Sequence, residues 1–215
     1  PGGRDGGPEK WRARSEYDGR RGGAGVGADL GVGVNEMLSN SELAAVDFIE
    51  LHNPVIDPVE IGGWWISDSP ENCQKFVIPP FTSILGGGYR IFDESHFNPG
   101  GGLGVNDFAL SSAGDDVYLV EPSGGLPFRF VASQSFGCAP TGETLGRHFN
   151  SIGDPHFVLM DADTRGSANS APRVGPAVIS EIMCYPAPGG NQFIELENIS
   201  GSPLNLWDPA NPAMT

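Results

Sequence analysis

The chain has 215 residues, 39% of them hydrophobic, with 32 glycines and 19 prolines. That hydrophobic content excludes a uniformly disordered chain, and so many turn formers favour short strands over long helices. A formal net charge of −15, from 12 basic and 27 acidic residues, argues against nucleic acid as a partner of the folded part. No apolar run approaches the roughly 18 residues of a membrane span, so no such span is expected.

Residues 1–30 hold six of the twelve basic residues and few apolar ones. We predict that they form a disordered Gly/Arg-rich linker. The alternative is an RNA-binding tail, because Arg20-Arg21-Gly22-Gly23 resembles an RGG motif. The linker is favoured, since only one such cluster occurs and acidic residues are interspersed.

From residue 32 the pattern changes to short apolar runs separated by Gly, Pro, Ser and Asp turn signals. No segment between residues 32 and 132 shows helical periodicity. A slip of parity at Gly62-Gly63 suggests a β-bulge within one of the runs. Eight short strands favour a sandwich or barrel. The strands are predicted at 32–38, 47–53, 59–66, 75–78, 89–92, 108–110, 117–121 and 128–132.

One core is expected between two sheets, because several large apolar residues recur at inward-facing strand positions. Trp64 is interpreted as the core tryptophan of the sandwich rather than as a ligand platform. The predicted core residues are Ile49, Leu51, Ile61, Trp64, Leu110 and Leu119.

The sequence repeats itself after a polar segment at 161–176, which we interpret as an interdomain linker. Glu181 follows Glu36, and Phe193 follows Phe48, by the same 145 residues (181 minus 36, 193 minus 48). A constant offset indicates tandem copies of one domain-sized unit. We therefore expect a first domain over 31–160 and the start of a second, truncated copy over 177–215.

The repeated pattern resembles the opening of the lamin-tail domain family. The first copy reads NEML, DFIELHNP and PVEIGGWWISD, and the second reads SEIM and QFIELENISGSPLNL. The resemblance covers roughly residues 32–170 and implies an all-β, immunoglobulin-like β-sandwich. The residues that carry this structural signature are Glu36, Phe48, Glu50, Asn53, Gly63, Trp64, Glu181, Glu195 and Asn198.

Two carboxylates, Glu36 and Glu50, are the residues we consider for acid/base catalysis. Glu36 and Glu50 could act as an acid/base pair, as in glycosidases. The alternative is that they accept structural hydrogen bonds, and it is favoured because both recur in the second copy. No catalytic, cofactor-binding or metal-binding residue is therefore assigned.

Metal sites are not expected. The run from Asp161 to Gly166 imitates the start of a calcium loop, but Arg165 and Pro172 stand where two ligands are needed. The four histidines lack zinc-ligand spacing. Cys73 and Cys138 could form one disulfide, although separate buried thiols are favoured.

The function expected from the sequence is a non-catalytic structural or interaction module of an exported multidomain protein, serving adhesion or display. The tandem arrangement of lamin-tail-type domains resembles that of multidomain secreted or cell-surface proteins of bacteria. The partner would be a protein or a surface polymer. The alternative is an accessory domain of a secreted hydrolase or spore-coat-type kinase whose catalytic part lies outside this sequence. A nuclear scaffold is a third option, but no coiled-coil heptads occur here.

Overall fold

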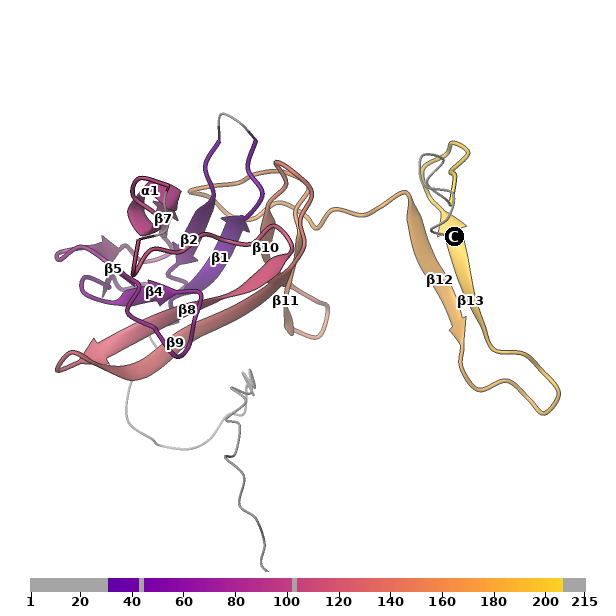
Figure 1. The fold of residues 1–215 in the computed structure, drawn as a ribbon. Helices are drawn as coiled ribbons and strands as arrows, with labels where there is room; N and C mark the ends of the chain where they lie inside the picture. Colours follow the sequence, from indigo (N-terminus) through magenta and orange to yellow (C-terminus); the bar gives the residue numbers. More distant parts are fainter. Residues whose placement is uncertain (1–30, 43–44, 102–103, 207–215) are drawn as a thin grey trace, which may run out of the picture.

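The computed structural model of the chain describes residues 31–42, 45–101 and 104–206. The linker predicted at 1–30, and the second copy's tail from Trp207 onwards, lie outside these residues. The regular secondary structure of the described chain is almost wholly antiparallel strand, so the prediction of an all-β fold is confirmed (Figure 1).

A five-stranded antiparallel sheet forms one layer, in the order β11-β10-β1-β2-β7. A four-stranded sheet in the order β5-β4-β8-β9 forms the other. A small two-stranded sheet, β3-β6, lies beside them. The bounds are β1 (Gly33–Leu38), β2 (Phe48–His52), β3 (Val59–Glu60), β4 (Trp65–Ser67), β5 (Phe76–Val77), β6 (Ser83–Ile84), β7 (Tyr89–Asp93), β8 (Gly114–Ser123), β9 (Leu126–Gly137), β10 (Leu145–Phe149) and β11 (Pro155–Leu159).

The core joins the apolar faces of the two large sheets. Val34, Ile49 and Leu51 come from the five-stranded sheet, while Ile66 and Leu119 come from the four-stranded one. Trp64 is only 6% exposed within this cluster. The prediction of one shared core is confirmed, since all its residues are members: Ile49, Leu51, Ile61, Trp64, Leu110 and Leu119.

The strand predicted over 59–66 is wrong in one respect, because the chain breaks into β3 and β4, which belong to different sheets. Gly63 has φ +84°, and the Trp64 N–H donates to the Ile61 carbonyl at 3.0 Å, which closes a tight turn. The left-handed conformation at Gly63 is one that glycine adopts without a steric penalty. The change of parity therefore marks a turn rather than a β-bulge.

Other differences are local. Residues 108–110 form no strand, although Phe108 and Leu110 are buried. One helical turn, α1 (Glu94–Phe97), is capped by the Asp93 side chain and is too short to show a period in the sequence. The strands β6, β10 and β11 were not predicted, because two are mixed in polarity and one has only two residues.

Beyond the body, β12 (Ala177–Met183) and β13 (Phe193–Asn198) form an antiparallel hairpin. In Figure 1 this hairpin stands apart from the two sheets and is joined to them by an extended segment. The second copy thus forms its first two strands. Residues 204–205, the counterpart of β3, form no strand, whereas β3 itself pairs with β6.

The hairpin repeats β1 and β2 down to the strand register. Glu36 lies opposite Glu50, and Glu181 lies opposite Glu195. The register shifts once in each pair, between Val34 and Glu36 and again between Ile179 and Glu181. Residue pairs across β1 and β2 therefore recur 145 positions later across β12 and β13.

One of the two cysteines considered for a disulfide differs from the favoured interpretation in its exposure. Cys73 is buried in a small cluster with Trp65, Tyr118 and Val120. Cys138 and Cys184 are exposed, and all three are free thiols. Separate thiols were expected, but Cys138 was expected to be buried.

Candidate functional site

The site is centred on Glu36 and Glu50, which face each other across β1 and β2. The register shift before Glu36 places Asn35 as the extra residue of β1, so that its side chain also reaches this pair. Both glutamates are completely buried. Two buried carboxylates at adjacent positions require strong hydrogen bonds, because burial penalises the charged form.

Every oxygen of the Glu36 carboxylate accepts hydrogen bonds. Oε1 accepts from the Thr144 hydroxyl at 2.6 Å and from the Thr164 backbone N–H at 3.1 Å. Oε2 accepts from the Thr164 hydroxyl at 2.7 Å and from the same N–H at 3.2 Å. Glu36 therefore ties β1 both to the residue before β10 and to the segment after β11.

Both oxygens of Glu50 are occupied as well. Oε1 accepts from the Asn35 side-chain amide at 2.8 Å, and Oε2 accepts from the Gly166 backbone N–H at 2.5 Å. Burial raises the pKa of Glu50, the bonds from Gly166 and Asn35 lower it, and the Glu36 and Asp163 carboxylates raise it. The net shift of the Glu50 pKa is upward.

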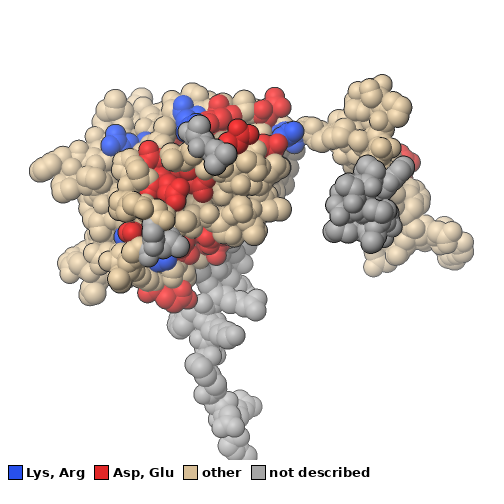
Figure 2. Space-filling view, turned by 45° about the horizontal axis from the view of Figure 1, so that its top comes forward, with Lys and Arg blue, Asp and Glu red and all other residues tan. Residues whose placement is uncertain are grey.

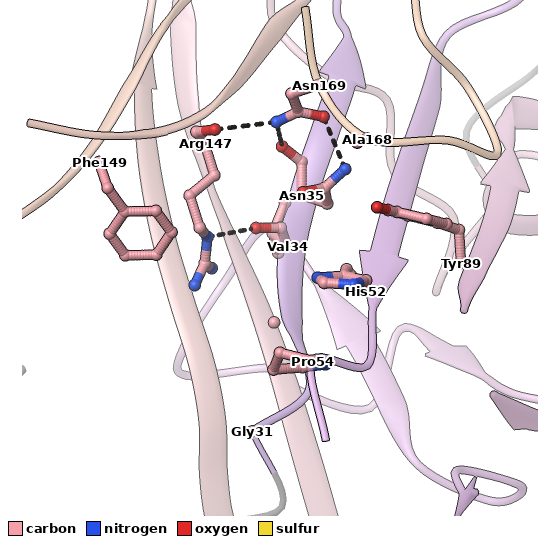
Figure 3. Close-up of a pocket in the computed structure, with 11 residues that line it drawn as sticks. Gly31, Val34, Asn35, His52, Pro54, Tyr89, Arg147, Phe149, Ala168 and Asn169 are labelled. Carbon is pink, nitrogen blue, oxygen red and sulfur yellow. Dashed lines mark hydrogen bonds between the residues drawn. The ribbon is translucent and has the colours of Figure 1, made fainter. Parts of the chain in front are cut away.

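Asn169 extends this hydrogen-bond network from β1 to β10. Asn169 donates through Nδ2 to the backbone oxygens of Asn35 and Arg147, at 3.0 and 2.9 Å. Its Oδ1 accepts from the Asn35 amide at 2.7 Å (Figure 3). Together, Thr164, Gly166 and Asn169 form what we call the clasp, a segment that fastens β1, β2 and β10.

The clasp corrects the prediction of a linker over 161–176. The first part of that segment is hydrogen-bonded to the five-stranded sheet, and Met160 forms an isolated bridge with Pro172. The polar composition that suggested a linker instead supplies donors for buried carboxylates. The packed part of the first domain therefore extends past residue 160.

The Asp161–Gly166 run that imitates a calcium loop also has a different role. Asp163 forms an ion pair with Arg165, and the Arg165 guanidinium lies over the Phe48 ring at 4.6 Å. The backbone N–H groups of Thr164 and Gly166 point at carboxylates rather than at a cation. Among the described residues, no group of three or more His, Cys, Asp or Glu side chains could hold a metal ion.

Beside the clasp is a recess of about 240 Å³, shown in Figure 3. His52 and Tyr89 stack with ring centroids 4.5 Å apart on one side, and Phe149 lies on the other. Between them the Arg147 Nε donates to the Val34 carbonyl at 3.0 Å. The recess is lined by Gly31, Gly33, Val34, Asn35, His52, Pro54, Tyr89, Arg147, Phe149, Ala168 and Asn169.

The electrostatics of the recess favour a neutral imidazole. Burial lowers the pKa of His52, the positive charge of Arg147 lowers it further, and a backbone hydrogen bond with Gly87 raises it. Burial raises the pKa of the Tyr89 hydroxyl, and the nearby Glu50 carboxylate adds to that shift. The recess thus combines aromatic surface, one guanidinium and neutral polar groups.

The other signature residues hold turns or lie in the core. Asn53 donates through Nδ2 to the carbonyls of Asp57 and Ile84, at 2.9 and 3.0 Å, and so holds the turn after β2. Asn198 repeats this contact with the Ser202 carbonyl at 2.7 Å. Phe48 and Trp64 are buried, and Gly63 forms the turn between β3 and β4.

The second-copy glutamates, Glu181 and Glu195, are less enclosed than Glu36 and Glu50. Ser180 donates to Glu195 Oε1 at 2.7 Å, as Asn35 does to Glu50. Both Glu181 and Glu195 are exposed, whereas their first-copy counterparts are fully buried. Sequence reasoning therefore found the carboxylates, but missed the donors that bond to them in the first copy: Asn35, Thr144, Thr164 and Gly166.

The surface gives no sign of a polyanion-binding face in the view of Figure 2. Acidic side chains gather there in contiguous patches, while Lys and Arg are scattered. No helix in the described part of the chain is long and apolar enough to cross a membrane. No family model, curated protein or solved structure matches this chain.

Proposed function

We propose that this chain is a non-catalytic structural or interaction module of the lamin-tail type, with an immunoglobulin-like sandwich, within an exported multidomain protein. The observation that carries the proposal is the saturation of the two carboxylates. All four oxygens of Glu36 and Glu50 accept hydrogen bonds from the chain itself. A general acid or base must instead reach the proton of a substrate.

The repeated strand register supports a modular, tandem arrangement. The β12–β13 hairpin copies β1–β2 in pairing and in the position of the register shift. Tandem modules serve to space or display surfaces, and an active site would not need to be duplicated in this way. Adhesion or display is the role that such an arrangement suits.

The recess around Arg147 is the proposed contact with a partner protein or surface polymer. Two aromatic walls, a guanidinium and neutral polar groups suit a chain of sugar rings or a peptide. No group of three or more His, Cys, Asp or Glu side chains that could hold a metal ion accompanies them among the described residues.

Catalysis is tested directly on the purified chain. Substrates for esterases, phosphatases, nucleases and glycosidases should show no turnover above background. A robust activity abolished by Glu36→Gln or Glu50→Gln, with the fold retained, would contradict the proposal and restore the paired-carboxylate mechanism.

Binding is tested by NMR titration with soluble fragments of cell-surface polysaccharides and extracellular proteins. A true partner should perturb the resonances of His52, Tyr89 and Gly33, and Tyr89→Ala should weaken its binding. Tyr185→Ala is the matched control, because Tyr185 is 94% exposed on the hairpin. Equal weakening by both variants would exclude the recess as the binding site.

The accessory-domain alternative makes the same binding prediction but requires a catalytic domain elsewhere in the parent chain. Determining the flanking sequence distinguishes the two, because a complete catalytic motif there would favour the accessory role.

A further inference from the structure

We propose that the solvent-facing side of the four-stranded sheet is a docking surface for a basic polypeptide segment, one that carries lysine or arginine next to aliphatic or aromatic residues. This surface, which we call the outer face, combines exposed apolar side chains with carboxylates. Its residues are Glu71, Asp115, Asp116, Tyr118, Leu126, Phe128 and Phe130. It shares no residue with the recess, so the inference goes beyond the proposed function and the two can fail separately.

A row of apolar side chains crosses this sheet on the side away from the core. Trp65 on β4 lies opposite both Val77 on β5 and Val120 on β8. Val120 in turn lies opposite Phe130 on β9. Residues directly opposite each other in a sheet share a face, and Trp65 and Val120 belong to a cluster separate from the core. The outward positions of a sandwich strand are ordinarily polar, so this row is unusual for a face that meets only water.

The chain itself covers only the middle of the row. Trp65 and Val120 are buried together with Cys73, which comes from the segment between β4 and β5. At the β9 end, Phe130 is 49% exposed, and its ring meets the Tyr118 ring edge-on with centroids 6.0 Å apart. The outer face is therefore open at β9.

The exposed apolar surface continues along β9. Leu126 and Phe128 are each 70% exposed. β9 is the last strand of its sheet, and the tip of the β8–β9 hairpin projects from the body in Figure 1. Three large apolar side chains that gather on one exposed strand end form the kind of patch that marks an interaction site.

The groups beside these rings are acidic. Asp116 lies opposite Ser135 and accepts a hydrogen bond from the Ser135 hydroxyl. Burial raises the pKa of the Tyr118 hydroxyl. Nearby carboxylates raise that pKa further, and in order of effect they are Asp116, Glu71 and Asp115. Negative charge thus lies directly beside the Tyr118 and Phe130 rings.

This negative charge has no counterpart within the sheet. The four strands and the segment between β4 and β5 contain two Lys or Arg residues. Of these, Lys75 pairs with Asp68, and Arg129 pairs with Glu121. In the described part of the chain, no ion pair involves the three carboxylates near Tyr118. The outer face therefore favours a cationic partner, whereas a second copy of this chain, with a net charge of −15, would be repelled.

The spacing along β8 sets the length of the partner segment. Val120 lies opposite Phe130, and Asp116 is four positions earlier (120 minus 116). Four residues of strand span about 13 Å, so an extended segment of about five residues reaches from the aromatic end to the acidic end. Such a segment needs apolar side chains over Phe128 and Phe130 and basic ones beside Asp115. Neutral or acidic sugar chains lack the cations, and this favours a polypeptide.

The first experiment titrates the full chain with a short synthetic peptide that has lysines in its first half and valine and phenylalanine in its second. NMR should show saturable binding that shifts the Tyr118 and Phe130 amide resonances and leaves those of His52 and Tyr89 unchanged. A peptide with glutamates in place of the lysines should not bind. A peptide with serines in place of the apolar residues should bind about tenfold more weakly. No binding of the lysine peptide at millimolar concentration would overturn the proposal.

The apolar half of the surface is tested with Phe128→Ser, which should weaken binding of the lysine peptide about tenfold. Ile152→Ser is the matched control, because Ile152 is 80% exposed in the turn between β10 and β11. It should leave the affinity unchanged. Equal weakening by the two variants would show that the outer face is not the binding site.

The acidic half is tested by its salt dependence, which remains informative if the Phe128 variant fails to fold. Binding should weaken as the ionic strength rises, because exposed charges are screened. The double variant Asp115→Asn with Asp116→Asn should bind more weakly and lose most of this dependence. Asp154→Asn, an exposed carboxylate in the β10–β11 turn, should behave as wild type. An unchanged salt dependence in the double variant would overturn the charge assignment.

A membrane and a second copy of the chain are the competing occupants of the apolar end. Cosedimentation with phosphatidylcholine vesicles that Phe128→Ser abolishes would assign this end to a lipid surface. A dimer in light scattering that the same substitution dissociates would assign it to self-association. Either result would overturn the proposal. Shifts confined to His52 and Tyr89 would do so as well, while leaving the proposed function of the recess intact.

Discussion

The Glu50 carboxylate accepts a 2.5 Å hydrogen bond from the backbone N–H of Gly166, a residue 116 positions further along the chain. Gly166 belongs to a segment whose composition resembles a linker, while Glu50 lies in the middle of a buried strand. The bond shows that the clasp is part of the first domain. It also explains how two adjacent carboxylates are accommodated in a core.

The first prediction concerns the Thr164 hydroxyl, which donates to Glu36 at 2.7 Å. Thr164→Val removes this donor and leaves a buried carboxylate oxygen under-satisfied. We expect a loss of about 1–3 kcal/mol in the free energy of unfolding, measured by urea denaturation. Thr141→Val is the control, because Thr141 is exposed, and it should have no measurable effect. Equal losses in both variants would show that the clasp hydroxyl contributes nothing specific.

The second prediction uses pH. The pKa of Glu50 is raised in the folded protein, so the folded state binds a proton at a higher pH than the unfolded chain does. The contribution of Glu50 to stability therefore increases as the pH falls from neutral towards 4.5, its ordinary value. Glu50→Gln cannot titrate, so wild type should gain stability relative to this variant over that range.

The measurement is urea denaturation of both proteins at several pH values, with the difference taken at each pH. Titrating groups remote from Glu50 contribute equally to both proteins and cancel. If wild type instead loses stability relative to Glu50→Gln as the pH falls, the folded-state pKa of Glu50 is lowered rather than raised.

The third prediction separates the two candidate boundaries of the first domain. Deletion of residues 177–215 should leave the melting temperature nearly unchanged, because the hairpin stands apart from the sheets. Deletion of residues 161–215 also removes the clasp and exposes the Glu36 and Glu50 carboxylates. It should lower the melting temperature sharply or prevent folding. Calorimetry measures the melting temperatures of both deletion variants. Similar values would place the end of the first domain at residue 160, as predicted from the sequence.

The fourth prediction tests the core. Trp64 is 6% exposed, so Trp64→Ala should cost roughly 3–5 kcal/mol of unfolding free energy. Phe81→Ala is a control aromatic truncation, because Phe81 is 98% exposed, and it should cost little. Denaturant titration with far-ultraviolet circular dichroism measures both. A loss below about 1 kcal/mol for Trp64→Ala would contradict the core assignment.

The fifth prediction concerns Gly146, which lies opposite Glu36 on β10. An added Cβ there would stand 2.8 Å from the Met160 side chain and 2.9 Å from Asn169 Nδ2. Gly146→Ala should therefore displace Asn169 and speed hydrogen exchange in residues 161–170 before the rest of the sheet is affected. Gly137→Ala is the control, because an added Cβ at that position meets nothing within 4 Å. Unchanged exchange in the Gly146 variant would mean that the clasp tolerates the displacement.

The sequence alone was sufficient for features that depend on local pattern. Alternation of apolar residues placed Ile49 and Leu51 in the core, and turn residues marked the ends of most strands. The constant 145-residue offset predicted that residues 177–198 repeat 32–53, and the strand register repeats in the same way. Periodicity and repetition are written in the order of residues, so they can be read without coordinates.

Only the tertiary structure decided which groups satisfy Glu36 and Glu50. Thr144, Thr164 and Gly166 lie more than 100 positions away, and bonds over such separations leave no local pattern in one sequence. The same reason accounts for the strand predicted over 59–66, whose two halves pair with different, distant strands. Composition cannot separate a solvated linker from a clasp, because both are rich in polar residues and glycine. What distinguishes them is whether buried acceptors lie within reach, and that depends on how the strands are brought together.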